Sequence, residues 1–208
     1  MVYLVKFGFL AFKDANNLIF AAPLLKQSFF QQNYEVLSGY DIPTPTDLYH
    51  FIVKIFTAMC NELSGKTLRD MLGFGSDGRF QEQTWQKEIY RIGTQVLGSE
   101  YFLLCDVGSV FGCDSKIDFY VDNKDWAIEL LRDGEDMAEH TVRFDTLKGE
   151  YKEIVKYAKS IAVIDIRSEV KKVQKLREDF IYVSWSEDFD AFKIESLGKE
   201  TVTIRFHN

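Results

Sequence analysis

Apolar residues recur at helical spacing in two long segments of the chain. The first segment begins at Asp47 and the second covers about residues 80–96. The apolar positions are Leu48, Phe51, Ile52, Ile55, Phe56 and Met59 in the first, and Trp85, Ile89, Ile92 and Val96 in the second. Because positions three and four residues apart share one face of an α-helix, each pattern predicts an amphipathic helix.

The rest of the chain after residue 100 consists mainly of short apolar runs. These runs are typical of strands and cover residues 101–107, 117–121, 126–131, 160–166, 180–185, 191–196 and 201–206. Two further helices are expected, over about residues 135–159 and 168–178. The order of helix, three strands, helix and strand predicts an α/β fold around a mixed sheet, with the last strand at a sheet edge.

The first 45 residues have a different organisation. Residues 3–22 predict a hairpin whose two strands are joined by the turn-forming DANN, and residues 24–34 have helical spacing. The stretch DIPTPT then marks a boundary, so we expect a small segment over residues 1–45 and an α/β domain over residues 46–208. The Gly-rich GFGSDGR, residues 73–79, follows no clear strand, which favours a plain or substrate-contacting loop over a phosphate cradle.

Composition and charge exclude several classes of protein. A net charge of −7 argues against coating nucleic acid by bulk electrostatics, although a local basic patch remains compatible with it. No run approaches the roughly 20 apolar residues that span a bilayer. The three cysteines form no CxxC pair and have no histidine at zinc-ligand spacing, so neither a disulfide framework nor a structural zinc site is indicated, and a reducing compartment fits best.

The stretch IDFYVDNKDWAIELL, residues 117–131, carries one acid in the middle of each of two apolar strands. A hairpin turn centred between Asn123 and Lys124 places Asp118 directly opposite Glu129. Opposed side chains lie roughly 5 Å apart at Cβ, so a proton or a cation must relieve the repulsion. Oxygen ligands of this kind suit Mg²⁺ or Mn²⁺ and phosphodiester hydrolysis. Alternatively, one acid faces solvent or pairs with a nearby basic residue, for which Arg132, Arg143 and Lys116 are available.

Two neighbouring helices offer further polar groups. Glu82, Gln86 and Glu88 lie on the helix before the strands, and Glu82 and Glu88 border its apolar stripe on opposite sides, so either could reach the sheet. His140 and Arg143 are three residues apart and share a helix face. His140 is a candidate for acid/base work or a phosphate contact, and a structural histidine is the alternative.

A helix glutamate, an Asp on one strand and a Glu on the next resemble the PD-(D/E)XK, or restriction-endonuclease-like, superfamily. More narrowly, GFGSDGRFQEQTWQKEIYR, CDVGSVFG, IDFYV, WAIELLRDGEDMAEHTVRF, GEYK and AVIDIR look like the C-terminal domain of fungal and oomycete Crinkler-type proteins, over about residues 72–206. The resemblance implies that Glu88, Asp118 and Glu129 are the active-site acids and metal ligands. It also implies that His140 and Arg143 are accessory residues.

The chain departs from the superfamily at one position. The lysine expected two residues after the second strand acid is replaced by Leu131. In the hairpin register Lys116 lies opposite Leu131 and on the face of Asp118, so Lys116, His140 or Arg143 is a candidate replacement for the missing base. An exposed lysine at the start of a strand is the alternative interpretation of Lys116.

The sequence therefore predicts a metal-dependent, Crinkler effector-like nuclease with Mg²⁺ or Mn²⁺ as cofactor. The competing hypotheses are a catalytically degenerate domain that binds nucleic acid or protein, and a structural appendage of an ATPase. The expected partners are DNA or RNA as substrate, a second copy of the chain and, in longer relatives, an upstream ATPase module, but no membrane. Residues 3–23 resemble the end of a winged-helix segment, and no GxxxxGK[ST] motif is present. The expected location is intracellular and reducing, including the host nucleus for an effector.

Overall fold

A seven-stranded mixed sheet organises the chain in a computed structural model that describes residues 10–12, 18–20, 44–71, 82–98 and 101–206. The strands are β3 (Leu103–Val107), β4 (Ile117–Val121), β5 (Trp126–Arg132), β6 (Ser160–Ser168), β7 (Phe180–Trp185), β8 (Ala191–Ser196) and β9 (Val202–Arg205). They lie in the sheet in chain order. The β5–β6 and β6–β7 pairs are parallel and the other pairs are antiparallel. The α/β fold with a mixed sheet is thus confirmed.

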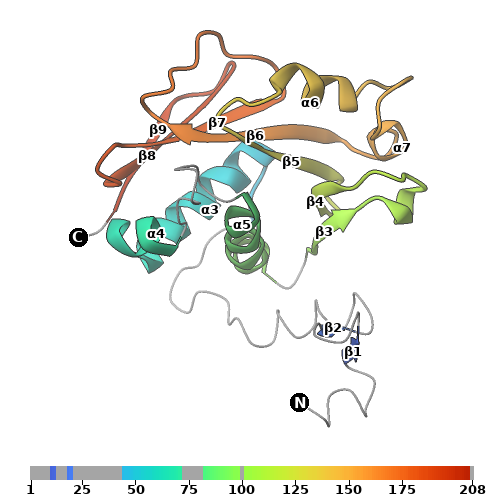
Figure 1. Cartoon of the computed structure of the whole chain (residues 1–208), viewed down its shortest axis with the longest axis horizontal. Helices are drawn as coiled ribbons and strands as arrows, with labels where there is room; N and C mark the ends of the chain where they lie inside the picture. Colours follow the sequence, from blue (N-terminus) through green and yellow to red (C-terminus); the bar gives the residue numbers. More distant parts are fainter. Residues whose placement is uncertain (1–9, 13–17, 21–43, 72–81, 99–100, 207–208) are drawn as a thin grey trace.

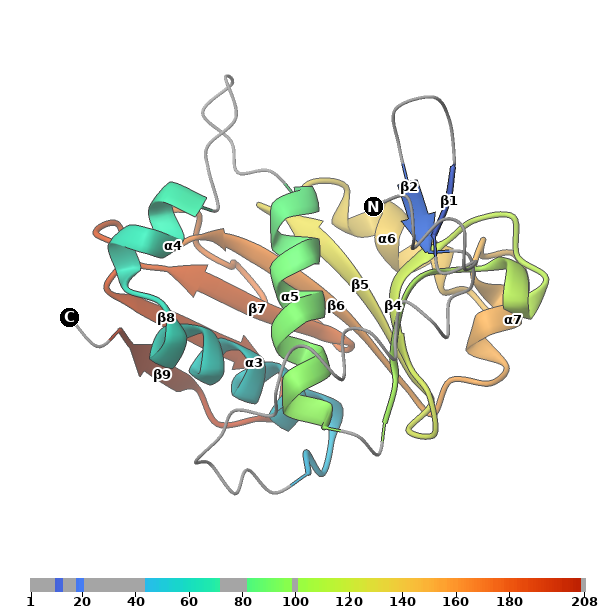
Figure 2. The same cartoon turned by 90° about the horizontal axis from the view of Figure 1, so that it is seen from below.

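Helices cover both faces of this sheet (Figures 1 and 2). On one face lie α3 (Leu48–Glu62), α4 (Gly65–Met71) and α5 (Glu82–Leu97). On the other lie α6 (Met137–Arg143) and α7 (Lys152–Val155). The short 3₁₀ helix η1 (Ser109–Phe111) lies between β3 and β4 in the chain. The two long predicted helices are confirmed as α3 and α5, and α4 was not predicted.

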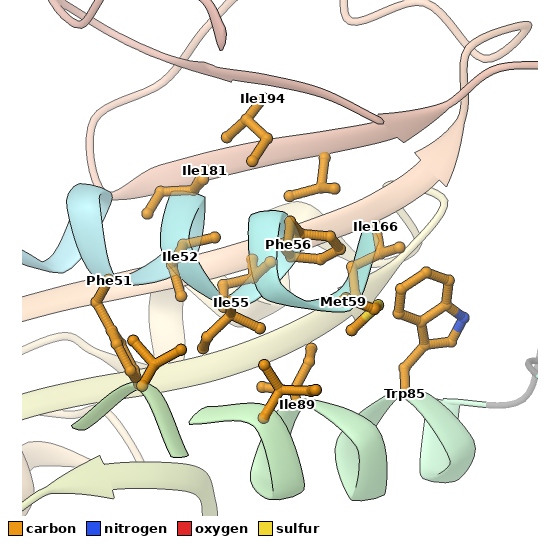
Figure 3. Packing of buried hydrophobic residues seen from close by; sticks show 14 of the residues in the cluster. Phe51, Ile52, Ile55, Phe56, Met59, Trp85, Ile89, Ile166, Ile181 and Ile194 are labelled. Atoms are coloured by element: carbon orange, nitrogen blue, oxygen red, sulfur yellow. The ribbon is translucent and has the colours of Figure 1, made fainter. Parts of the chain in front are cut away.

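The main core lies between α3, α5 and the sheet (Figure 3). Phe56 is fully buried, with its ring centroid 5.0 Å from that of Phe192 on β8 and 6.1 Å from that of Trp85 on α5. Phe51 packs in the same way against Trp126 of β5. Burial of these large rings fixes the position of α5 over the sheet, which determines where its polar side chains point.

Asp47 is the N-cap of α3 and supports the first testable prediction. Its Oδ1 accepts a hydrogen bond of 2.7 Å from the backbone N–H of His50. Partial burial opposes ionisation of Asp47, but this hydrogen bond and the charge of Lys199 outweigh it and lower the pKa. We expect Asp47→Ala to reduce the free energy of unfolding by about 1 kcal/mol near neutral pH, measured by urea denaturation. The loss should shrink as pH falls through the lowered pKa, because protonation removes the charged acceptor from the wild type as well.

Asp47→Asn is the matched control for this prediction. Asparagine is an equally good N-cap, so it should retain most of the stability. An Asp47→Asn variant as unstable as Asp47→Ala would show that the charge pair with Lys199, 3.2 Å away, dominates instead.

The predicted single helix over residues 135–159 is wrong. The chain forms Met137–Arg143 and Lys152–Val155 with a turn between them. The Asp145 carboxylate accepts hydrogen bonds from two backbone N–H groups that follow it, which is a local alternative to helix. At Gly149 a Cβ atom would lie 2.3 Å from the carbonyl oxygen of Arg143, so the chain can approach itself this closely only at glycine.

The predicted helix over residues 168–178 is also wrong, because the segment forms turns and irregular chain. Strands β6 and β7 are parallel neighbours, and the backbone N–H of Val163 donates to the carbonyl oxygen of Asp179. The chain must therefore run back from Ser168, at the end of β6, along about five strand residues to the start of β7. That distance is about 17 Å at strand rise. An eleven-residue helix spans only about 16 Å, which leaves no residues for the turns at its ends.

The first 43 residues are described only in part. Strands β1 (Leu10–Phe12) and β2 (Leu18–Phe20) pair antiparallel, which confirms a hairpin within residues 3–22. The predicted helix over residues 24–34 and the loop GFGSDGR lie outside the described residues. The division at residue 45 and the likeness of the first segment to a winged helix remain predictions.

Candidate functional site

The register of the β4–β5 hairpin is the one that the turn predicted. Phe119 pairs with Ile128 and Val121 with Trp126, so Asp118 and Glu129 are the next residues along the two strands. At this point the pairing between β4 and β5 ends, whereas β4 still pairs with β3 and β5 with β6. The two acids therefore lie where neighbouring strands of the sheet separate.

The carboxylate of Asp118 fills this separation. Its Oδ2 accepts a hydrogen bond of 2.7 Å from the backbone N–H of Leu130, in place of a backbone acceptor on β4. Its Oδ1 accepts one of 3.0 Å from Nε2 of Gln86 on α5. Burial raises the pKa of Asp118 to about 8, and the negative charge of Glu129 adds to this effect despite the bond from Leu130. Asp118 is therefore a carboxyl group poised to exchange a proton for another cation.

Glu129 is 4% exposed and concentrates its contacts on one oxygen. Oε1 accepts hydrogen bonds from the Tyr151 hydroxyl at 2.9 Å and from Arg143 at 3.1 Å. Nδ1 of His140 lies 3.3 Å from the same oxygen but makes no hydrogen bond to any described residue. Oε2 of Glu129 is also buried and has no hydrogen-bond partner in the part of the chain that the structure describes. A buried carboxylate oxygen without a partner is costly, so this atom is a candidate ligand for a cation.

Helix α5 contributes Glu82 to the site rather than Glu88. Glu82 lies at the start of α5, where desolvation of its carboxylate and the charge of Glu129 raise its pKa although Arg132, His140 and Arg143 oppose the shift. Its charge in turn helps to raise the pKa of Asp118.

Glu88 faces helix α3 instead. Nε of Arg91 donates to both of its oxygens at 3.2 Å, and Arg91 also pairs with Glu62 at 2.7 Å. The assignment of Glu88 to the acid cluster is therefore corrected: Glu88 follows Gln86 by two residues, about 200° of helical rotation, and so lies away from the side of α5 that carries Gln86.

The superfamily's lysine is expected at the position of Leu131, and Lys116 is one candidate for its replacement. The side chain of Lys116 is exposed, and the contact of Lys116 with the site runs through its carbonyl oxygen, which accepts from the Tyr151 hydroxyl at 3.0 Å. Leu131 is 4% exposed and packs with Val163, Phe180 and Tyr182. A buried leucine in an apolar cluster on the sheet thus occupies the position where the superfamily has its lysine.

Comparison with protein-family models, curated proteins and solved structures gives no match. The site must therefore be interpreted from its own geometry. Among the described residues, no helix has the length and apolar character required to cross a membrane.

The donor atoms fit a hard divalent ion. The described residues contain no group of three or more His, Cys, Asp and Glu side chains in metal-binding arrangement. Asp118 and the unpartnered oxygen of Glu129 nevertheless provide two carboxylates, and Mg²⁺ is usually held by one or two carboxylates together with waters and substrate phosphates. The raised pKa of Asp118 indicates the same need for positive charge.

One polar residue of the site, Tyr151, was not predicted. It reaches Glu129 from the turn before α7, and no sequence pattern relates these positions. Gln86 was named among the polar groups of its helix but was given no contact with the acids, although it follows Glu82 by one helical turn and shares its face. The periodicity that identified the apolar stripe of α5 contains this information.

Proposed function

We propose that this chain carries a restriction-endonuclease-like core that hydrolyses phosphodiester bonds of nucleic acid with Mg²⁺ or Mn²⁺. The observation that supports the proposal most directly is the buried, unpartnered Oε2 of Glu129 beside the high-pKa carboxyl of Asp118, at the point where β4 and β5 separate. In keeping with the resemblance of its motifs to Crinkler-type proteins, we propose an effector role inside a host cell, including its nucleus.

Each residue has a specific task in this proposal. Asp118 and Glu129 hold the ion, and Gln86 and Tyr151 fix the orientation of the two carboxylates through the hydrogen bonds described above. Glu82 supplies a third carboxylate at the exposed entrance. The bound ion would activate a water molecule and stabilise the charge that develops on the phosphate. Loss of a hydrogen bond that orients a metal-binding carboxylate typically lowers metal affinity or activity 10–100-fold.

His140 replaces the missing lysine best. Its Nδ1 is buried near Oε1 of Glu129 and has no hydrogen-bond partner among the described residues, so it can accept a proton from an attacking water. Arg143 is already engaged with Glu129 and Glu139, and Lys116 is exposed. Arg143 can instead offer its positive charge to the substrate phosphate.

The alternative function is a catalytically degenerate domain that binds nucleic acid or protein. The specific observation in its favour is the burial of Leu131 among apolar side chains at the lysine position. In that case the carboxylates would be a structural remnant, satisfied by Arg143, Tyr151 and a proton on Asp118.

Cleavage assays with two glutamate variants test the proposed site. Purified protein is incubated with single-stranded and duplex DNA and RNA, with Mg²⁺, Mn²⁺ or chelator. We expect metal-dependent cleavage by the wild type, and a loss of about 10–100-fold in Glu82→Gln. Glu88→Gln is the matched control on the same helix and should cleave normally when its folding is intact, because Glu88 contacts Arg91 and not the site.

The other outcomes distinguish the two functions. Cleavage that is insensitive to chelator, or that is lost in folded Glu88→Gln but retained in Glu82→Gln, would show that the proposed site is wrong. Binding of oligonucleotide without cleavage under any metal condition would favour the degenerate domain.

A further inference from the structure

A cationic pocket of about 320 Å³ lies next to the candidate site and includes Met137, the first residue of α6, in its lining. Most of its other lining residues come from the turn that follows β5 and from the irregular segment between β6 and β7. Four cationic side chains line it: Arg167, Lys172, Lys175 and Arg177. The only acid among its lining residues is Asp133. This concentration of positive charge stands out in a chain with a net charge of −7.

The charges at the mouth of the pocket are not neutralised. Lys172, Lys175 and Arg177 are exposed, and none of them forms an ion pair with a described residue. The side chain of Asp133 is buried, and its carboxylate forms an ion pair with Lys171, with 2.8 Å between Oδ2 and Nζ. Three exposed cations thus surround one opening without an acidic partner, and an anion is the group that complements them.

The floor of the pocket is a built structure. The side chain of Arg167 is 8% exposed and is held by Asp165 and by the carbonyl oxygen of Lys171, yet its Nε is buried without a hydrogen-bond partner among the described residues. Gly134 permits this position, because a Cβ there would lie 2.7 Å from an Arg167 nitrogen. A buried guanidinium with one unpartnered donor and three exposed cations without ion pairs line the same pocket, and this positive charge favours an anionic ligand.

A second pocket, of about 390 Å³, shares Arg167 and Lys172 with the first and differs in the pairing of its cations. Its lining includes Glu169 and Glu195, and Glu195 pairs with Lys193 at 2.9 Å. Its Lys171 pairs with Asp133, which leaves Lys172 as its exposed cation without an ion pair to a described residue. Of these two pockets, the one bounded by Asp133 and Gly134 therefore has the larger number of unpaired exposed cations.

Helix α6 connects this pocket to the acid site. Met137, the first residue of α6, lines the pocket, and His140 and Arg143 on the same helix contact Glu129. At 1.5 Å rise per residue, Met137 and Arg143 are separated by only about 9 Å along the helix axis. A polyanion that reaches the acid site can therefore also reach the pocket.

We propose that this pocket binds a phosphate group of a nucleic-acid strand, next to the phosphate that lies at Asp118 and Glu129. Lys172, Lys175 and Arg177 attract the strand, and Arg167 donates to the phosphate from below. The choice of nucleic acid rests on the proposed function, whereas the anion site itself rests on the charges and the buried donor. The segment between β6 and β7 thereby gains a role in holding substrate.

Binding measured without metal tests this proposal separately from catalysis. Fluorescence anisotropy of labelled single-stranded and duplex oligonucleotides is recorded in chelator at several salt concentrations. We expect the triple variant Lys172→Gln, Lys175→Gln, Arg177→Gln to bind at least about 10-fold more weakly than the wild type. The slope of log affinity against log salt should fall by about two to three, because each phosphate contact contributes about 0.7–0.9.

The matched control is a second triple variant, Lys66→Gln, Lys148→Gln, Lys152→Gln. It removes the same charge from exposed lysines that do not line the pocket and should bind nearly as the wild type does. Equal losses in both triple variants, or a pocket variant that binds normally, would overturn the proposal, as would a wild type that binds no oligonucleotide. Inorganic phosphate as competitor separates the sources of the anion: displacement at micromolar phosphate would assign the pocket to a free phosphate ligand instead.

Failure of catalysis leaves a different signature. If the pocket is correct and the nuclease proposal is wrong, the wild type binds oligonucleotide in a pocket-dependent manner but does not cleave it with any metal. If only the pocket is wrong, cleavage occurs and the pocket variant binds as the wild type does.

Discussion

Replacement of Asp118 by asparagine is expected to abolish metal-dependent cleavage and, in the same protein, to stabilise the metal-free domain at about pH 8. The folded-state pKa of Asp118 is about 8, against an ordinary value of 3.8 for an aspartic acid side chain. Burial is the main cause and the charge of Glu129 is the second. Asparagine keeps the shape of the side chain but carries no charge, so it removes the cost of ionisation and also the ability to hold a cation strongly.

The sign of this effect follows from proton linkage. Below about pH 4 the carboxyl is protonated in both the folded and the unfolded state, so wild type and variant should differ little. As the pH rises from about 4 to 8, the unfolded chain releases the proton while the folded chain retains it, and the wild type loses up to about 1.4 kcal/mol per pH unit. The advantage of Asp118→Asn should therefore grow through this range and level off above about pH 8.

Calorimetric melting temperatures in chelator at several pH values measure this effect. Asp114→Asn, at an exposed acid in the loop before β4, is the control and should show no such rise. Added Mg²⁺ should raise the melting temperature of the wild type and not of Asp118→Asn, because a ligand stabilises only the form that binds it. If Asp118→Asn melts at the same temperature as the wild type at pH 8, with or without metal, then ionisation of Asp118 does not destabilise the folded state.

The local part of the site could be predicted from sequence because it depends on near neighbours. The turn residues set the register, the register brings Asp118 and Glu129 to the same position on adjacent strands, and the structure confirms both steps. The apolar stripes of α3 and α5 were equally local. In each case one periodicity or one turn fixes the outcome.

The remaining contacts depend on distant packing and could not be predicted in this way. Tyr151 reaches Glu129 only because the expected long helix is interrupted near Gly149, where the chain approaches its own backbone. The choice of Glu82 over Glu88 depends on which flank of α5 faces the separated strands. The packing of α5 on α3 decides this, including the ion pair between Arg91 of α5 and Glu62 of α3. Sequence periodicity identifies the buried stripe but not the partner of each flank.

The segment between β6 and β7 shows the same limit on a larger scale. Its alternation of charged and apolar residues favoured a helix, but the short connection between parallel strands forces an irregular path. Val173 and Leu176 from this path pack against the cluster around Leu131, and its cations gather around Arg167. A buried ionic pair anchors the arrangement: Asp165 is fully buried and accepts a hydrogen bond from the N–H of Gly134 as well as pairing with Arg167.

Removal of one partner of this pair is expected to cost more than removal of both. Asp165→Ala leaves the guanidinium of Arg167 buried without its counter-charge, which typically destabilises a protein by about 3–5 kcal/mol. The double variant Asp165→Leu, Arg167→Met replaces the pair with apolar side chains of similar size and should cost clearly less, because no isolated charge remains. Urea denaturation at neutral pH measures both.

The same two variants separate the structural role of Arg167 from its role in the pocket. The double variant should fold yet bind oligonucleotide more weakly than the wild type, because the donor at the floor of the pocket is lost while the exposed Lys172, Lys175 and Arg177 remain. If Asp165→Ala costs less than about 1 kcal/mol, Arg167 must find solvent or another partner, and the floor of the pocket is then not held in place by this pair. A large cost for the single change, a small cost for the double change and weakened binding in the double variant would together identify Asp165 as the residue that positions a cation for phosphate.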